Sequence, residues 1–374
     1  RRALPAPSRP ERDFAEFAAA RDALDLDLIA LWQTLFGVQP IGIRDNFFAL
    51  GGHSLLAVRL LAAIQERFRR EVPLSALFQH GTIEGLASLL TESSAATPFS
   101  PLVPLQETGA PPVLFCIHNA GGGLEGYRRL ISYLGPEQPV YGFRARGLER
   151  GEEPLEGVEE MAKANIAALR RFQPRGPYHL IGWSFGSLVA FEMARRLRAQ
   201  GEAVPLLVLG DPRDPGPSTT MQDADEVLVL AFFASEAGLA VEEQELRQLA
   251  GEERLAHLVD RAREAGLISA EIGLATGIEY LRRLVSVFQA SWRAARDYVP
   301  GPYAGPVTIF RAAETMQGAP NEVGDGGWGA YCSTPPALYR VPGNHQSLLR
   351  EPNVQTSAAV LRELLRQRRG NGAP

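Results

Sequence analysis

Residues 178–186 read YHLIGWSFG, and this stretch decides the fold of the larger part of the chain. An apolar run ends in a turn that has glycine two positions before and two positions after Ser184, and a helical pattern follows at 186–199. A serine in a tight turn between a strand and a helix is held at the helix N-terminus, and only small residues fit two positions before it and two positions after it. The pattern predicts that Ser184 is a nucleophile. An ordinary glycine-rich turn between a strand and a helix is the alternative.

Short apolar runs recur on both sides of this stretch and alternate with helical patterns. Strands are expected at 113–117, 139–143, 178–182, 205–209, 306–310 and 337–341, and helices near 124–134, 158–172, 186–199, 277–297 and after 353. Continuous apolar strands separated by helices indicate a parallel sheet that is covered on both faces. The alternation breaks at about 212–275, where amphipathic helical sequence predicts a lid above the sheet.

A serine nucleophile needs a base, and the chain offers six histidines. His345 follows the last expected strand, and loops at the carboxyl ends of parallel strands gather at one edge of a sheet. His345 is therefore the best candidate for the base, with an ordinary surface-loop histidine as the alternative. The remaining histidines lie inside a strand (His179), in the expected lid (His257), in the N-terminal helical region (His53, His80) and at the end of the first strand (His118).

The acid that would orient this histidine has three candidates. Asp211 directly ends the strand at 205–210, and Glu314 follows the next strand. Both satisfy the order serine, acid, histidine, but Asp211 lies nearer to its strand end and has the shorter side chain. Asp214 is a weaker third choice, and a turn cap is the alternative role for Asp211.

The loop HNAGGG at 118–123 is rich in glycine. Its backbone N–H groups, together with that of Phe185, are candidates to bind the oxyanion of a tetrahedral intermediate. The same loop contains the pattern G-x-G-x-x-G at 121–126, which is a formal dinucleotide fingerprint. That function requires an acid at the end of the second strand, where the chain has Phe143 and Arg144. We therefore discount it.

The N-terminal region follows a different pattern. Apolar residues recur at helical spacing in three stretches of 11–91 and predict a small helical bundle. Within it, the string DNFFALGGHSLL at 45–56 places Ser54 at the start of a helix. The N–H groups and the dipole of a helix N-terminus favour an attached phosphate, whereas an N-cap is the plainer role for a lone serine. Prolines at 1–10 and 92–104 predict linkers on either side.

The composition limits the classes of function. The 374 residues have room for two or three domains, and a net charge of −5 gives no general attraction to nucleic acid or anionic lipid. No stretch approaches 18 apolar residues, so no membrane span is expected. Two cysteines are too few for a disulfide framework, which favours the cytoplasm. The chain opens without methionine, and we expect a piece of a longer polypeptide.

Residues 11–91 resemble the peptidyl carrier domains of nonribosomal peptide synthetases, whose signature is D-N-F-F-x-L-G-G-H-S-L. Residues 105–374 resemble the type I thioesterase domains that end such synthetases. The resemblance implies a multi-domain chain, in which a small all-α four-helix carrier bundle at 11–91 precedes an α/β-hydrolase fold with a helical lid insertion. The segment 92–104 would be a flexible linker. Residues 1–10 would be a linker from an upstream adenylation domain. The sequence LPAP at 4–7 resembles the motif at the tail of such domains.

The resemblance also implies roles for single residues. Ser54 would carry 4′-phosphopantetheine, and the family places its acid after the strand that follows the nucleophile helix, which favours Asp211. The family motif G-x-H corresponds to residues 343–345, and H-P-A-G-G corresponds to HNAGG at 118–122. The backbone N–H of Ala120 would then join that of Phe185 as an oxyanion donor. Asn119 departs from the usual proline, which bears on the stiffness of this loop.

The implied function is release of a finished peptide. A peptidyl thioester on Ser54 would pass to Ser184, and water or a nucleophile within the peptide would then free a linear acid or a macrocycle. The implied partners are upstream adenylation and condensation domains, a phosphopantetheinyl transferase and the peptidyl thioester itself. Two alternatives are a carrier and docking module that releases nothing, and a free-standing esterase. No metal is expected.

Overall fold

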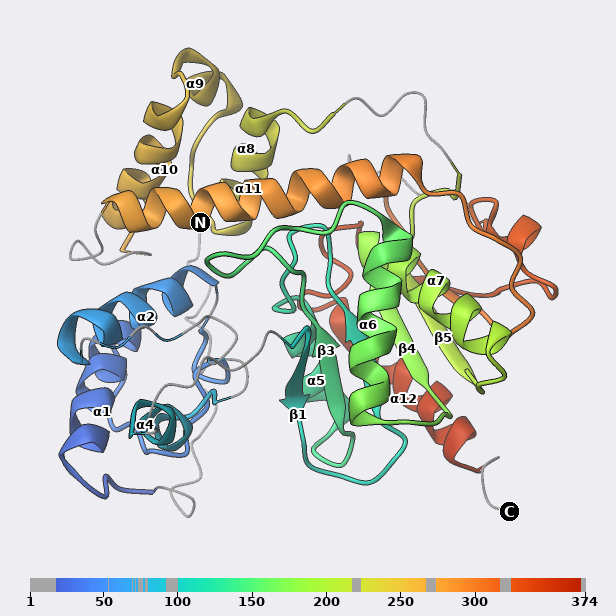
Figure 1. The fold of residues 1–374 in the computed structure, drawn as a ribbon, viewed down its shortest axis with the longest axis horizontal. Coiled ribbons are helices and arrows are strands. Elements are labelled where there is room, and N and C mark those ends of the chain that lie inside the picture. The colour runs from blue at the N-terminus through green and yellow to red at the C-terminus, as the bar shows by residue number, and fades with distance from the viewer. Residues whose placement is uncertain are drawn as a thin grey trace, which may run out of the picture.

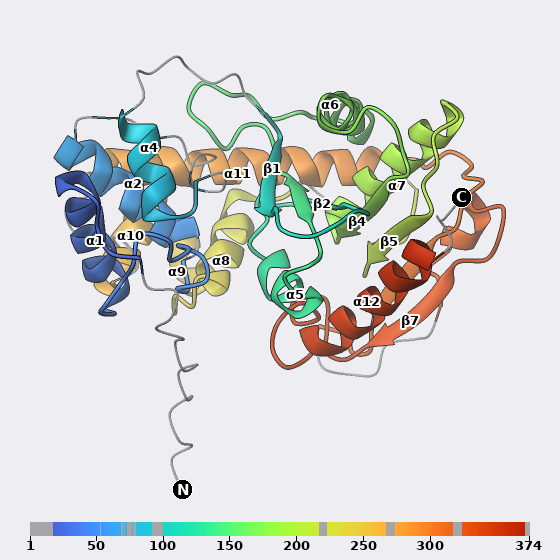
Figure 2. The same cartoon turned by 90° about the horizontal axis from the view of Figure 1, so that it is seen from below.

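A computed structural model of the chain describes residues 18–370, apart from 53, 69, 71, 73–76, 78–79, 92–99, 217–222, 267–273 and 317–323. The expected linker at 1–10 and most of the expected linker at 92–104 therefore lie outside the described residues. Figures 1 and 2 show a small helical region beside a larger region built on a sheet.

The helical region contains α1 (Ala23–Phe36), α2 (Ser54–Phe68) and α4 (Ile83–Thr91) among its described residues. Its core is aromatic at the centre, because Trp32 and Phe47 are both fully buried with ring centroids 5.5 Å apart. Leu28 and Ile64 are also fully buried. The four-helix bundle predicted from the sequence is described in three of its helices, and the chain between α2 and α4 is described only in part.

The larger region holds a seven-stranded sheet in the order β1-β3-β2-β4-β5-β6-β7. The strands are β1 (Leu102–Gln106), β2 (Leu114–Ile117), β3 (Val140–Phe143), β4 (His179–Trp183), β5 (Leu206–Gly210), β6 (Thr308–Ala312) and β7 (Ala337–Val341). The six strands from β2 to β7 pair in parallel, as their continuous apolar sequences predicted. Each lies within two residues of its expected range.

Strand β1 is the difference from the sequence prediction. It begins at Leu102, inside the segment 92–104 that we expected to be a linker, and it pairs antiparallel with β3 at the edge of the sheet. Val103 is fully buried there, which favours a strand despite the neighbouring prolines. Pro104 fits an edge strand because it has no N–H to donate, and the pairing becomes irregular directly after it.

Helices cover both faces of the sheet (Figures 1 and 2). One face packs against α6 (Val158–Phe172) and α7 (Phe185–Ala199), and the other packs against α5 (Tyr127–Leu134) and α12 (Val354–Gly370). The expected helices at 158–172 and 186–199 correspond closely to α6 and α7. This two-sided cover explains why the inner strands β2 and β5 are buried and apolar throughout.

The expected lid segment forms helices α8 (Glu226–Glu236), α9 (Glu243–Gln248) and α10 (Glu252–Glu264), followed by the long helix α11 (Leu274–Asp297). Figure 1 shows α11 running across the top of the sheet region toward the helical region. Buried apolar residues such as Leu230, Leu258 and Val287 join these helices into one cluster. Among the described residues, no helix has the length and apolar character needed to cross a membrane.

Candidate active site

Ser184 lies in the turn between β4 and α7, and its backbone has a conformation that residues other than glycine rarely adopt. Its φ is 57° and its ψ is −124°. The neighbouring glycines are required by space: a Cβ on Gly182 would lie 2.0 Å from the carbonyl oxygen of Gly186, and one on Gly186 would lie 2.5 Å from that of His118. The tight turn predicted from the sequence is therefore present, and it presents Ser184 at the start of α7.

Ser184, His345 and Asp211 are joined by two hydrogen bonds. His345 Nε2 lies 2.8 Å from Ser184 Oγ, and His345 Nδ1 lies 2.7 Å from Asp211 Oδ2. Along the chain, His345 lies 134 residues after Asp211 and 161 residues after Ser184. They meet because β4, β5 and β7 all end at the same edge of the parallel sheet. The tautomer that these bonds require has its proton on Nδ1 while Nε2 accepts from the serine.

Asp211 is fixed by the strands on either side of it. Its N–H donates to the carbonyl of Phe310, and its Oδ1 accepts from the N–H of Ala312 at 3.0 Å. Burial raises the pKa of Asp211, but the hydrogen bonds from His345 and from Ala312 outweigh burial, so the pKa stays below its ordinary value. The carboxylate is therefore ionised at neutral pH and holds the Nδ1–H of His345.

His345 is held by the loop that follows β7. Asn344 Oδ1 accepts from the N–H groups of Gln346 and Ser347, both at 3.1 Å, and the N–H of Asn344 donates to Ser347 Oγ. The indole of Trp183 lies beside the imidazole, with 6.0 Å between ring centroids. Sequence reasoning did not single out these supporting residues, because an asparagine and a serine in a turn carry no signal of what they position.

The other acids and histidines considered from the sequence lie elsewhere. Glu314 and Asp214 are exposed, and the hydrogen bond of His345 goes to Asp211. His179 is buried in β4, and His257 on α10 lies 2.8 Å from the carboxylate of Glu245 on α9. His53 lies outside the described residues.

Of the two expected oxyanion donors, Phe185 directly follows Ser184 in the chain. Phe185 is the first residue of α7, so no carbonyl within the helix accepts its N–H. Ala120 lies in the loop after β2, where Asn119 Oδ1 accepts from Gly121 N–H at 3.0 Å and the Asn119 carbonyl accepts from Gly122 N–H at 2.9 Å. Asn119 therefore supplies one side-chain bond, to the N–H of Gly121, that proline could not make at this position.

A cavity of about 350 Å³ lies next to this site, under the insertion. We call it the lid cavity. It is mostly apolar, and it extends from Trp183 and Asn119 near Ser184 to residues of α8, α10 and α11. Those residues include Phe233, Ala262 and Leu281.

The helical region offers a different kind of site at Ser54. Ser54 is the first residue of the 15-residue helix α2. The turn before it is compact, because Gly51 has a φ of 99° and a Cβ on Gly52 would lie 2.3 Å from the ring of Phe47. The turn leaves the N-terminal N–H groups and positive dipole end of α2 directly at Ser54, which is the environment that favours a phosphate.

Side-chain contacts between described residues join the helical region to the sheet region, and two of them involve residues near Ser54 in the chain. Arg59 Nη1, on α2, donates to the carbonyl of Gly266 after α10 at 3.3 Å. The guanidinium of Arg128, on α5, lies 3.0 Å from the ring centroid of Phe48. Burial lowers the pKa of Arg128 to about 9, with Glu125 opposing the shift, so the group stays charged at neutral pH. Sequence reasoning missed Arg128, because one arginine on an amphipathic helix has no distinguishing signal.

A parallel sheet with a serine elbow after one strand, an acid after the next and a histidine after the last defines the α/β-hydrolase class. Comparison with known families agrees with this class. The thioesterase domain family matches residues 112–366, and the chain belongs to this family. Residues 27–90 match the phosphopantetheine attachment site family. The resemblance predicted for both regions is thus confirmed.

Curated proteins are similar to much or nearly all of the chain. The chain is 34% identical over 377 residues to chondramide synthase cmdD of Chondromyces crocatus. The alignment covers 97% of this chain and 9% of that protein. It is 40% identical over 237 residues to a dimodular nonribosomal peptide synthase of Bacillus subtilis (strain 168), covering 61% of this chain and 10% of the relative. The chain therefore spans about a tenth of the length of these relatives.

The chain is also similar to solved structures. A holo four-domain nonribosomal peptide synthetase bound to AMP and glycine is 28% identical, with a TM-score of 0.66, over 97% of this chain and 27% of that one. The Vlm2 thioesterase domain is 25% identical, with a TM-score of 0.51, over 70% of this chain and 96% of that one.

Proposed function

We propose that this chain is the carrier and thioesterase part of a nonribosomal peptide synthetase, and that it releases the finished peptide. In this proposal Ser184 is the nucleophile, His345 is the base and Asp211 orients the base. The observation that carries the proposal is the pair of hydrogen bonds made by His345, at 2.8 Å to Ser184 and 2.7 Å to Asp211. A positioned base of this kind activates an otherwise weak hydroxyl.

Ser54 is the proposed attachment point for 4′-phosphopantetheine. The residues fit this group, because Ser54 begins a helix long enough to have a strong N-terminal dipole and the turn before it is closed by Gly51 and Gly52. When bound, 4′-phosphopantetheine supplies a thiol that carries the acyl group as a thioester. The phosphopantetheine attachment family match at 27–90 supports this assignment.

In the first step, Ser184 Oγ attacks the thioester carbonyl and its proton passes to His345 Nε2. The carbonyl oxygen becomes negatively charged, and the N–H groups of Phe185 and Ala120 stabilise it. Asp211 stabilises the imidazolium that forms. The C–S bond then breaks, His345 returns the proton to the leaving thiolate, and an ester on Ser184 remains.

In the second step, His345 takes a proton from the releasing nucleophile, which attacks the ester carbonyl. The C–O bond to Ser184 breaks, and His345 returns the proton to Ser184 Oγ. Water in this role gives a linear acid, and an amine or hydroxyl within the peptide gives a macrocycle. Either nucleophile uses the same residues.

The lid cavity is the proposed route between Ser54 and Ser184. At one end it includes Ala262, four residues before the carbonyl of Gly266 that accepts from Arg59. At the other end it includes Trp183, next to Ser184. The apolar walls exclude water from the thioester while it is transferred.

The proposed partners follow from the place of this chain in a synthetase. They are upstream adenylation and condensation domains, a phosphopantetheinyl transferase that modifies Ser54, and the peptidyl thioester that arrives on it. The proposed location is the cytoplasm, where Cys116 and Cys332 would stay reduced; both are free thiols.

Turnover of a short acyl thioester of N-acetylcysteamine tests the proposed nucleophile. We expect wild-type protein to hydrolyse it and Ser184→Ala to lose at least about 10³-fold in kcat, because no other group forms the acyl-enzyme. Ser132→Ala, at an exposed serine on α5, is the control and should match wild type. Unchanged turnover in Ser184→Ala would rule out Ser184 as the nucleophile.

A further inference from the structure

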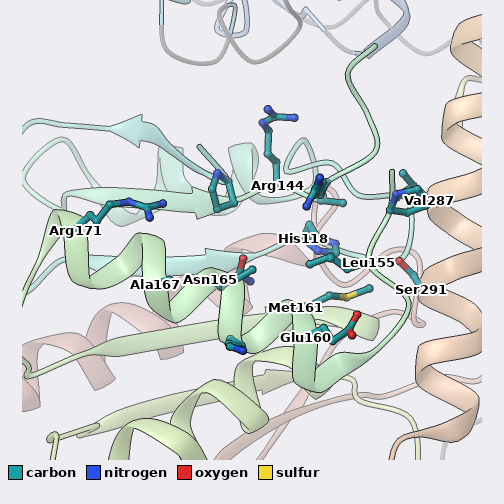
Figure 3. Close-up of a pocket in the computed structure, with 16 residues that line it drawn as sticks. His118, Arg144, Leu155, Glu160, Met161, Asn165, Ala167, Arg171, Val287 and Ser291 are labelled. Atoms are coloured by element: carbon teal, nitrogen blue, oxygen red, sulfur yellow. The ribbon is translucent and has the colours of Figure 1, made fainter. Parts of the chain in front are cut away.

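A second cavity, of about 470 Å³, lies along helix α6 (Figure 3). We call it the α6 cavity. Its walls come from α6, from the loop after β3 and from the middle of α11. Figure 3 shows Arg171 at one end of this cavity and Ser291 of α11 at the other, with His118 and Asn165 between them.

The side chains of α6 leave room for an extended ligand. Glu160, Ala164, Ala167 and Arg171 are spaced at i, i+4, i+7 and i+11, so they form one stripe along the helix, with two alanines in its middle. The stripe is about 16 Å long at 1.5 Å per residue. An extended peptide of about five residues has this length.

The interior of the α6 cavity contains buried polar groups that lack partners. Asn165 is 4% exposed and Ser291 is 1% exposed, yet neither Asn165 Nδ2 nor Ser291 Oγ has a hydrogen-bond partner in the part of the chain that the structure describes. Buried polar atoms are nearly always hydrogen-bonded, because leaving one unpaired is costly. Both residues line the cavity, so a ligand bound there would supply the hydrogen-bond partners that Asn165 Nδ2 and Ser291 Oγ lack.

His118 adds an acceptor to this interior. Burial lowers its pKa to about 4, against a hydrogen bond to Asn119 that raises it, so the ring is neutral at neutral pH. His118 Nδ1 lies 2.8 Å from the Asn119 carbonyl and must donate to it, which leaves Nε2 as an acceptor. A donor at Asn165, an acceptor at His118 and a hydroxyl at Ser291 match the C=O and N–H groups of peptide amides.

The charge at the rim favours an anion. Arg146, Lys163 and Arg171 are exposed at the cavity, and Glu160 is the acid among its lining residues. Arg144 is buried and pairs with Glu149 and Glu152, so it adds little net charge. The rim therefore carries an excess of positive charge, and Arg171 supplies the cation at the C-terminal end of α6.

The α6 cavity and the lid cavity both reach the loop after β2. His118 lines the α6 cavity, and the His118 ring lies 5.9 Å from that of Phe185, the residue after Ser184. Asn119, the next residue, lines the lid cavity, and Arg144 lines both. A chain that reaches Ser184 through one cavity would thus continue into the other.

We propose that the α6 cavity binds the peptide portion of the thioester, with about five residues lying along α6 and a negatively charged group at the end farthest from the thioester. The proposal rests on the proposed function of Ser184. The amides of the peptide bond to Asn165, Ser291 and His118, and the anionic group lies at Arg171, while Lys163 adds positive charge nearer the start of α6. The cavity therefore sets the substrate class as an acidic peptide.

The test uses two pentapeptidyl N-acetylcysteamine thioesters that differ in one group, a glutamate or a glutamine at the residue farthest from the thioester. We expect wild-type protein to show a KM about fivefold lower for the glutamate peptide at low salt, and a smaller difference at high salt because the rim is exposed. Arg171→Glu should remove or reverse this preference, and Lys163→Glu should weaken it. Arg175→Glu makes the same charge change at an exposed residue outside the cavity, and it should keep the preference.

A short acyl thioester separates this inference from the proposed function. Asn165→Ala and Ser291→Ala should raise the KM of both pentapeptides and leave turnover of the short thioester unchanged. Equal KM values for the two pentapeptides in wild-type protein, or a preference that survives both charge reversals, would overturn the peptide site alone. Failure of wild-type protein to turn over the short thioester would contradict the proposed function, and the peptide site with it.

Discussion

Ser184 and Asp211 are the two non-glycine residues with positive φ in the described part of the chain, at 57° and 44°. Such backbone conformations cost free energy and persist only where the surrounding structure enforces them. Here the hydrogen bond from Ser184 N–H to the Gly210 carbonyl links the two strained turns. Both strained residues carry side chains that bond to His345, so the strain is located where the proposed chemistry takes place.

At the residue scale, Asp211 makes a prediction about pH. Its pKa is lowered in the folded protein, so its stabilising effect is complete above the ordinary aspartate pKa of about 3.9 and is lost as the pH falls through the lowered value. Thermal unfolding should therefore show wild type more stable than Asp211→Asn at pH 6, with the difference shrinking toward pH 2. A constant difference over this range would contradict the assignment.

The same substitution should lower activity across neutral pH. Asparagine cannot stabilise the imidazolium of His345, and we expect kcat for a short thioester to fall by about 10³- to 10⁴-fold. Glu314→Gln changes the exposed acid that was the alternative candidate, and it should leave kcat unchanged. If Glu314→Gln lowered kcat and Asp211→Asn did not, Glu314 and not Asp211 would be the acid that orients His345.

At the element scale, the elbow depends on its glycines. Gly182→Ala would place a methyl group 2.0 Å from a backbone carbonyl oxygen, which has no free direction in which to move. We expect a loss of about 3 kcal/mol of stability, seen as a lower unfolding midpoint. Gly157→Ala is the matched control, because its φ is −128° and its nearest neighbour would be 3.7 Å away. Equal midpoints for the two variants would contradict a tight elbow.

The sequence predicted strands and helices of the sheet region well, because runs such as 205–209 are apolar throughout and are bounded by turns. It missed β1, since three prolines in 92–104 outweighed two buried apolar residues that only a neighbouring strand could reveal. Asp211 and Glu314 both satisfied the order serine, acid, histidine along the chain. In the structure Asp211 is buried and Glu314 is exposed. The contacts of Arg128 and Asn344 depend on distant segments, which no local pattern encodes.

At the scale of the whole molecule, the helical region must bring Ser54 to the lid cavity. Joining the two regions in one chain raises the effective concentration of the acyl group near Ser184. The contacts of Phe48 with Arg128 and of Arg59 with Gly266 lie close to Ser54 along the chain. They are the side-chain interactions that we expect to orient it.

Removal of one contact should slow transfer without affecting chemistry. We expect Arg128→Ala to slow acyl transfer from the chain's own Ser54 by about fivefold, the effect of losing one partly buried cation–π contact. Turnover of a free short thioester should stay unchanged. Arg129→Ala, at the exposed neighbour on α5, is the control. Equal transfer rates in the two variants would show that the Arg128 contact does not orient the carrier.

Localisation of the acyl group after loading tests the central claim most directly. Ser54 is first modified with acylated phosphopantetheine by a phosphopantetheinyl transferase, and the quenched protein is digested and analysed by mass spectrometry. In wild type the acyl group should appear on the peptide that contains Ser184, whereas in Ser184→Ala it should stay on the peptide that contains Ser54. Release from Ser184→Ala at the wild-type rate, with no acyl group found at Ser184 in wild type, would contradict the account.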